Sequence, residues 1–342
     1  MAPRSKWCLE RSVPDSSFPL MKLRALLFAS TTSVFLALLS SPASASPSSK
    51  ELLTAGRVDE AMASLESEIA KSPSNAEAQN LLCRAYFMLD EWDRAVGACE
   101  RARSLDPQNS RYHLWLGRVY GGKAEHAGFL SAAGLAKKVR TSFERAVELD
   151  LKDWEARADL ADFYLEAPGI VGGGRERAQA QIDAMMPLNA MMAHLLQAKI
   201  AARNKDSATA EREYRAAIDS SHSGARAWFE LGYFYFHANR LDEMEQAFRK
   251  VETAPPDRPD ALRDAASVLL RANRDLPLAV RLLRKYLAYP AEEAPAFKAH
   301  DLLGQILEKQ GDRAGAAEEF RAALAMAHGY TRAQEDLRRV SR

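Results

Sequence analysis

The feature that most constrains this chain is a helical pattern that recurs along it. Two segments show it well: SNAEAQNLLCRAYFMLDEWDRAVGACERARSLDP, which ends at Pro107, and GARAWFELGYFYFHANRLDEMEQAFRKVETAPP, which ends at Pro256. Each contains an apolar run at helical spacing, a polar turn, a second helical run and a closing proline. Pro73 and Pro107 stand 34 residues apart. Such a period indicates stacked helix pairs, because a single pair cannot bury its own apolar faces.

The later of these segments resembles the tetratricopeptide repeat, whose period is about 34 residues. The residues that match its W-x-x-L-G-x-x-Y run and its second-helix aromatic position are Trp228, Leu231, Gly232, Tyr235 and Phe248. In the earlier segment the matching residues are Leu82, Tyr86, Ala95, Ala102 and Pro107. The resemblance covers nearly all of residues 49–328. It implies an all-α fold, a right-handed superhelical solenoid of antiparallel helix pairs with a C-terminal capping helix.

We divide the chain into four parts. They are an overextended leader at residues 1–20, a signal peptide at 21–45, an array of about seven to eight repeat units at 46–329, and a capping helix at 330–342. The capping assignment rests on Ala333, Leu337 and Val340, which share one helical face while charged residues occupy the rest. Terminal repeats need such a cap, because nothing stacks on their outer face.

The expected signal peptide begins at Met21 and has three parts. Lys22 and Arg24 precede an apolar run that ends at Leu39, and Ala43-Ser44-Ala45 forms an A-x-A cleavage signature that ends at Ala45. The apolar run is shorter than the roughly 20 residues that span a bilayer, which favours cleavage over an uncleaved anchor. We therefore expect an exported protein of bacterial type, periplasmic or secreted. It would meet a membrane only through an uncleaved signal.

Charge and motif content narrow the function. Lys and Arg together number 47 against 46 Asp and Glu, a net charge of +1, so no basic surface for nucleic acid is predicted. The chain contains neither H-E-x-x-H nor G-x-S-x-G, and its seven His include no pair at i, i+4. We expect no catalytic residues, no metal and no cofactor, and therefore a protein that is not an enzyme.

The family resemblance also implies a binding surface. In tetratricopeptide proteins the first helices line a concave groove, and set positions of each repeat point into it. Carried over to this sequence, those positions are Arg84, Phe87, Arg118, Lys199, Arg203, Arg226, Phe229, Tyr233, Phe236 and His237. Phe229, Tyr233 and Phe236 follow i, i+4, i+7 and form one stripe, which either faces the groove or is covered by a neighbouring helix. Another unit presents Asp162 and Glu166 at these positions, so charges of both signs alternate with apolar groups, which suits a protein or peptide partner.

Two units are longer than the period. About ten extra residues lie near 121–138 and about five near 166–175, both between the first and second helix of a unit. We expect two enlarged turns, neighbours on one edge of the solenoid, where they could take part in binding. The glycines at 172–174 lack the spacing of a phosphate loop, which favours a flexible turn over an anion site.

Cys83 and Cys99 occupy positions that face each other within one repeat of the family. In an oxidising compartment they could form a disulfide bond. The alternative is two small buried side chains, since free cysteine is commonly buried.

The leading hypothesis is an exported scaffold that binds a protein or peptide partner in its concave groove, at the edge with the enlarged turns, or at both. A self-associating structural protein of the cell envelope is the first alternative. An envelope enzyme with an unrecognised site is the second.

Overall fold

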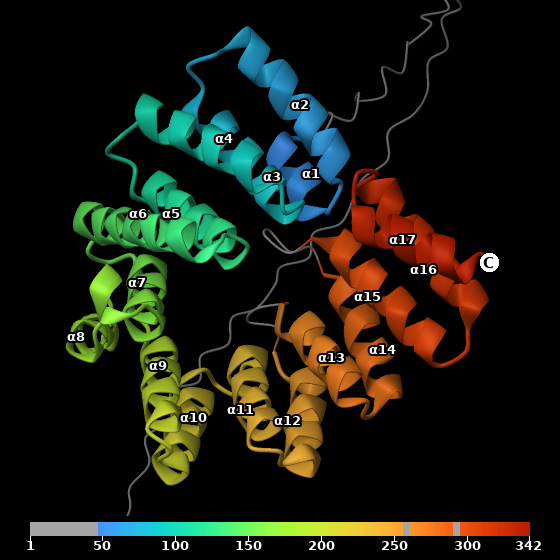
Figure 1. The fold of residues 1–342 in the computed structure, drawn as a ribbon. Coiled ribbons are helices and arrows are strands. Elements are labelled where there is room, and N and C mark those ends of the chain that lie inside the picture. The colour runs from blue at the N-terminus through green and yellow to red at the C-terminus, as the bar shows by residue number, and fades with distance from the viewer. Residues whose placement is uncertain (1–46, 256–259, 290–294) are drawn as a thin grey trace, which may run out of the picture. The chain divides into compact units, whose positions relative to one another are not determined.

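The computed structural model describes residues 47–255, 260–289 and 295–342. The expected leader and signal peptide, together with Pro256, lie outside them. Within the described ranges every regular element is a helix (Figure 1). The α-helices are α1 (Ser49–Thr54), α2 (Val58–Lys71), α3 (Ala76–Met88), α4 (Trp92–Leu105), α5 (Ser110–Glu125), α6 (Phe129–Leu149), α7 (Trp154–Glu166), α8 (Arg175–Met185), α9 (Ala190–Arg203), α10 (Ser207–Ser220), α11 (Ala225–His237), α12 (Leu241–Thr253), α13 (Asp260–Ala272), α14 (Leu276–Leu287), α15 (Ala296–Lys309), α16 (Arg313–Met326) and α17 (Thr331–Val340).

These helices pack as consecutive antiparallel pairs, from α1 with α2 to α15 with α16, and α17 packs on the last pair. Each odd-numbered helix from α3 to α13 also contacts the next odd-numbered helix along the chain, except for α5 and α7, which both contact α6. This is the contact pattern of a solenoid, in which each repeat packs on its neighbours. The all-α fold expected from the sequence is confirmed, and α17 stands where the capping helix was predicted.

The small residue of the repeat motif allows the two helices of a pair to approach closely. A Cβ atom added to Gly232 of α11 would collide with the Phe248 ring on α12. Gly304 of α15 meets Phe320 of α16 in the same way, with the added Cβ 2.5 Å from the ring. Both phenylalanines are fully buried. The motif pairs glycine with an aromatic residue because the ring fills the space that a side chain would otherwise need.

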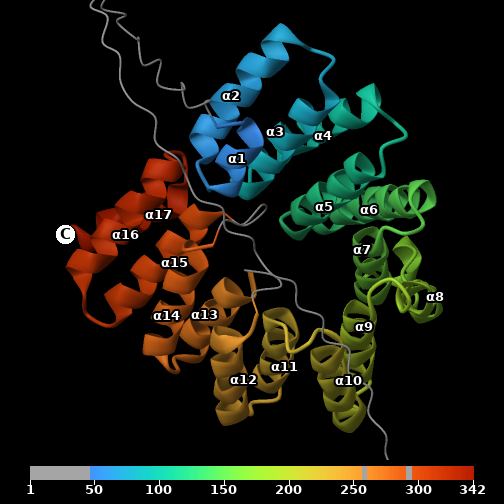
Figure 2. The ribbon, with the colours of Figure 1, turned by 180° about the vertical axis from the view of Figure 1, so that it is seen from behind.

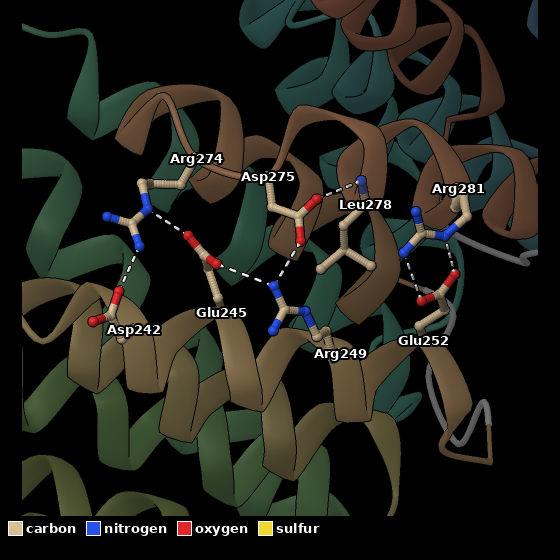
Figure 3. Close-up of polar contacts among 8 residues, drawn as sticks. All are labelled: Asp242, Glu245, Arg249, Glu252, Arg274, Asp275, Leu278 and Arg281. Carbon is tan, nitrogen blue, oxygen red and sulfur yellow. Dashed lines mark hydrogen bonds and ion pairs between the residues drawn. The ribbon is translucent and has the colours of Figure 1, made fainter.

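Polar contacts connect consecutive repeats on the surface (Figure 3). One face of α12 presents acidic and basic side chains toward the α13–α14 turn and α14. Arg274 forms ion pairs with Asp242, at 2.5 Å, and with Glu245. Arg249 pairs with Glu245 and, at 3.1 Å, with Asp275. Asp275 also caps α14 by accepting a hydrogen bond from the Leu278 backbone N–H, and Arg281 forms two hydrogen bonds with Glu252. Such a network orients neighbouring repeats.

The prediction of an enlarged turn near 121–138 is wrong, because the extra residues are mostly helical. α5 continues to Glu125 and α6 begins at Phe129, so only residues 126–128 connect them. The added segment is rich in Ala, Leu and Lys, which favour helix. The extension of α5 also packs: a Cβ on Gly122 would lie 2.5 Å from the Trp92 ring, and His126 stacks on Trp92 with centroids 5.3 Å apart.

The second insertion does form a longer turn, at residues 167–174. It contains the three-residue 3-10 helix η1 (Gly169–Val171), and Gly172 follows with φ of 100°, a conformation that favours glycine. η1 contacts α6, and a side chain on Gly172 would collide with the guanidinium of Arg140. The turn therefore lies beside the middle of α6, eleven residues after the first residue of that helix.

The first and last repeats of the array are in contact. Helix α2 touches α16, and the two ends of the array lie side by side in both ribbon views (Figures 1 and 2). One buried apolar cluster contains Leu53 and Val58 from the beginning of the array together with Phe297 and Ala327 from its end. The chain thus buries apolar surface between segments more than 200 residues apart.

Candidate functional site

The residues expected in the groove all lie on first helices of repeats. Arg84 and Phe87 are on α3, Arg118 is on α5, Lys199 and Arg203 are on α9, and the remaining five are on α11. The structure does not bring all ten together. It places them in three settings, which are an inner cavity, a row of ion pairs and an aromatic stripe.

One cavity, here called the inner cavity, has a volume of about 500 Å³. Its lining residues come from α3, α4, α5, α7, α13 and α15 and from the residues next to α3 and α15: Phe87, Met88, Asp90, Trp92, Trp115, Arg118, Asp159, Asp260, Arg263, Pro295 and Lys298. A volume of 300–1,000 Å³ is typical of binding pockets. The cavity is therefore large enough to accept side chains of a partner.

Aromatic rings form one wall of the inner cavity. Phe87 packs edge-on against Trp92 and Trp115, with ring centroids 5.5 and 5.7 Å apart. The guanidinium of Arg118 lies over the Trp115 ring, 5.1 Å from its centroid; that of Arg84 lies 5.0 Å from the centroid, but Arg84 lines a separate cavity. The indole Nε1 of Trp115 is buried without a hydrogen-bond partner among the described residues. The wall thus combines apolar rings, cations and one buried donor.

Charged groups of both signs line the rest of the inner cavity. Arg118 donates to Asp159 at 2.6 Å and to Glu155 at 3.0 Å. Burial raises the pKa of Asp159, and the neighbouring Arg118 opposes that rise. Lys298 pairs with Asp90 at 2.9 Å. These pairs give the cavity nearly balanced charge, so it does not select for a strongly acidic or strongly basic ligand.

Two of the expected groove cations form a row of ion pairs between α9 and α7. Lys199 binds Asp162 at 3.1 Å, and Arg203 binds Glu166 at 2.5 Å. The Arg203 guanidinium also donates to the backbone carbonyl of Leu165. In this structure both side chains connect neighbouring repeats.

A second cavity of about 240 Å³ continues the inner surface toward α11. Arg226, Phe229 and Glu230 line it together with Asp260 and Arg263, which also line the inner cavity. Of the five groove residues expected on α11, Arg226 and Phe229 therefore adjoin the larger cavity. These two belong to a continuous inner surface that includes Phe87 and Arg118.

The aromatic stripe of α11 is half-buried rather than open. Phe229 stacks on Tyr233 at 5.8 Å and on the buried Phe248 at 6.0 Å. Arg271 of α13 lies over Tyr233 and Phe236, 5.9 and 5.3 Å from their centroids. The neighbouring repeat thus covers part of the stripe, as the alternative interpretation allowed. At the C-terminal end of α11, by contrast, the neighbouring His237 is exposed.

Strongly exposed apolar residues occur at the two insertions. Phe129 and Leu130 in the first turn of α6 are 88% and 86% exposed, and Ile170 in η1 is 90% exposed. Along α6, Phe129 lies about 16 Å from the Arg140 position where the second insertion packs, given a rise of about 1.5 Å per residue. The structure does not show these three side chains in one patch.

Most of the residues that line the inner cavity were not predicted from the sequence. Trp115 immediately precedes the motif residues Leu116 and Gly117, so the sequence was sufficient to place it on the first helix of its repeat. Asp90 and Trp92 follow the first helix, and Lys298 comes from a repeat at the far end of the chain. No local pattern indicates that Asp90 and Lys298 meet.

In the described part of the chain, no His, Cys, Asp or Glu residues form a group of three suited to a metal ion. None of the described helices is long and apolar enough to cross a membrane.

Family models of the tetratricopeptide repeat match residues 52–118 and 195–259. Peroxisome biogenesis protein 5 of Arabidopsis thaliana is 30% identical over 34% of this chain and 16% of its own length. Superkiller complex protein 3 of Mus musculus is 23% identical over 60% of this chain and 15% of its own length. The chain thus spans about a sixth of each of these relatives. The solved structure of a tetratricopeptide-repeat protein from Thermus thermophilus is also similar, with 20% identity and a TM-score of 0.44. The alignment covers 57% of this chain and 99% of the Thermus chain.

Proposed function

This chain is a tetratricopeptide-repeat protein, and we propose that it is an exported scaffold that binds an extended peptide segment of a partner protein on its inner surface. Tetratricopeptide repeats are protein-interaction modules, which supports the general class. The observation that carries the specific proposal is the inner cavity, where an aromatic wall adjoins paired charges of both signs. A peptide supplies apolar side chains for the rings and polar backbone groups for the charged side chains beside them.

Panning a displayed peptide library on the full chain tests this assignment. The selected peptides should bind the Phe87→Ala and Arg263→Ala variants at least about tenfold more weakly than the wild-type chain. A tenfold loss of affinity corresponds to about 1.4 kcal/mol. Ile170→Ser and Phe129→Ser provide controls at the two insertions, since both residues are exposed and neither lines the cavity. Peptides that bind the cavity variants normally but lose affinity for the controls would move the site to the insertion edge.

Two features support the proposal of export. The sequence carries the three-part signal pattern up to Ala45. The structure also joins Cys83 and Cys99 in a disulfide bond, a bond that persists mainly in oxidising compartments.

The export proposal is tested by expressing the full chain in a bacterial host, fractionating the cells and sequencing the N-terminus of the recovered protein. The expected product is periplasmic or secreted and begins at Ser46. An unprocessed product in the cytosol would contradict export.

A further inference from the structure

The contact between the first and last repeats lies at the wall of the inner cavity. Asp90 follows α3 near the beginning of the array, and Lys298 lies on α15 near its end. Their side chains line the cavity together and form an ion pair with two hydrogen bonds of 2.9 and 3.0 Å. Whatever separates these two residues also opens one wall of the cavity.

Three further contacts hold the same two regions together. His328, between α16 and α17, donates its backbone N–H to Asp59 of α2 at 2.7 Å, and its ring Nδ1 lies at the same distance from that carboxylate. Gly56, between α1 and α2, lies so close to α15 that an added Cβ would be 2.6 Å from the Ala296 Cβ. Phe297 of α15 is fully buried in the apolar cluster that also contains Leu53 and Val58 of the first repeat.

This junction differs physically from every other junction between repeats. Elsewhere consecutive repeats are joined by the chain itself and by helix–helix packing, so separating them breaks a repeat interface. At this junction the covalent connection runs through the whole array, and the contacts that close it among the described residues are all non-covalent. Small rotations distributed over many repeat interfaces can open it without disrupting any one of them.

We propose that the contact between the first and last repeats is a latch, which opens to admit a peptide to the inner cavity and closes over it. The role of the cavity rests on the proposed function, whereas the opening and closing of the latch can be measured with no ligand present. Because the cavity takes its lining from both sides of the junction, a peptide that touches both sides stabilises the closed state, and the closed state holds the peptide more tightly.

A wedge at Ala296 tests the latch directly. Ala296→Leu places a larger side chain against the Gly56 backbone, at the first residue of α15, where it leaves the core of its own repeat untouched. Ala314→Leu makes the same change near the start of α16 at an exposed position and is the matched control. The readouts are the radius of gyration from small-angle X-ray scattering and hydrogen exchange of the His328 amide, which the closed state protects.

The wedge variant should show a larger radius of gyration and about tenfold faster exchange at His328, while the control keeps the wild-type values. A folded wedge variant with wild-type scattering and exchange would overturn the latch. Lys298→Glu offers a second route, because it sets a like charge against Asp90. Adding Asp90→Lys should restore the closed state, and a double variant as open as the single one would remove the ion pair from the latch.

Gating has its own readout. Peptides selected on the wild-type chain should associate about tenfold faster with the wedge variant, because the opening step is no longer needed. Equal association rates in a variant shown to be open would overturn gating while leaving the contact itself established. Failure to select any peptide would count against the proposed function, and the scattering and exchange results would stand independently.

Discussion

Cys83 of α3 and Cys99 of α4 form a disulfide bond, with their Cα atoms 5.2 Å apart. They are separated by 16 residues, the same spacing as Gly232 and Phe248 in a later repeat. In both repeats the first residue is the small one of the first helix and the second is its partner on the second helix. The disulfide thus stands where other repeats place a glycine against a phenylalanine ring.

This equivalence predicts how the bond can be replaced. Cys83→Ala with Cys99→Ala should lower the free energy of unfolding by about 3 kcal/mol, the magnitude expected for closing a loop of this length. Cys83→Gly with Cys99→Phe should recover part of that loss by restoring the contact found at Gly232. Thermal midpoints with and without reductant check both, and reductant should affect only the wild-type chain. An alanine variant as stable as the oxidised wild type would contradict the prediction.

A hydrogen bond between repeats should contribute measurably to stability at Tyr164. Its phenol on α7 donates to Glu144 on α6 at 2.8 Å, and burial, followed by that hydrogen bond, raises the pKa of Tyr164 to about 12. Tyr164→Phe removes the donor and should lower the free energy of unfolding by about 1 kcal/mol. Tyr289→Phe is the control, since Tyr289 is 40% exposed. Equal midpoints for the two variants in thermal denaturation would show that the bond contributes nothing.

The docking of the capping helix should depend on pH. Burial, and then the nearby Asp336 carboxylate, raises the pKa of Asp301 to about 6. Because the folded state holds this proton more tightly than the unfolded chain, the carboxylate destabilises folding above about pH 6. That penalty is relieved as the pH falls toward 4, near the ordinary pKa of aspartate.

Asp301→Asn should therefore raise the free energy of unfolding at pH 7.5 by on the order of 1–3 kcal/mol and have little effect at pH 4. The amide keeps an oxygen that can accept the hydrogen bond from Gln305. Thermal midpoints measured across this pH range provide the check. A variant that is less stable than the wild type at pH 7.5 would refute the assignment of a buried, destabilising charge.

The aromatic stripe of α11 should affect both binding and stability. Phe229→Ala with Tyr233→Ala removes lining of the second cavity and should weaken peptide capture. It should also lower the thermal midpoint, because Phe229 stacks on the buried Phe248. Affinity is therefore measured well below that midpoint, with circular dichroism confirming the helical fold. Undiminished capture by the folded variant would exclude the stripe from the binding surface.

The repeat register was readable from the sequence because it is local. Arg84, Arg118 and Tyr233 each stand two residues after the motif leucine of their unit, and all three lie on first helices. Helical periodicity alone determines which face such a position occupies. Helical periodicity was insufficient near residue 129. The insertion there was predicted to form a turn, but it extends α5 and α6 instead. Packing against Trp92 stabilised that extension.

The sequence by itself thus determined the helix pairs, their order and the facing positions of Cys83 and Cys99 within one repeat. Only the tertiary structure decided that Asp90 and Lys298, 208 residues apart, share a cavity. It also decided that neighbouring repeats partly cover the α11 stripe and engage Lys199 and Arg203 in ion pairs. The physical reason is that relative orientation accumulates from small rotations at every repeat interface. No single motif encodes the sum of these rotations.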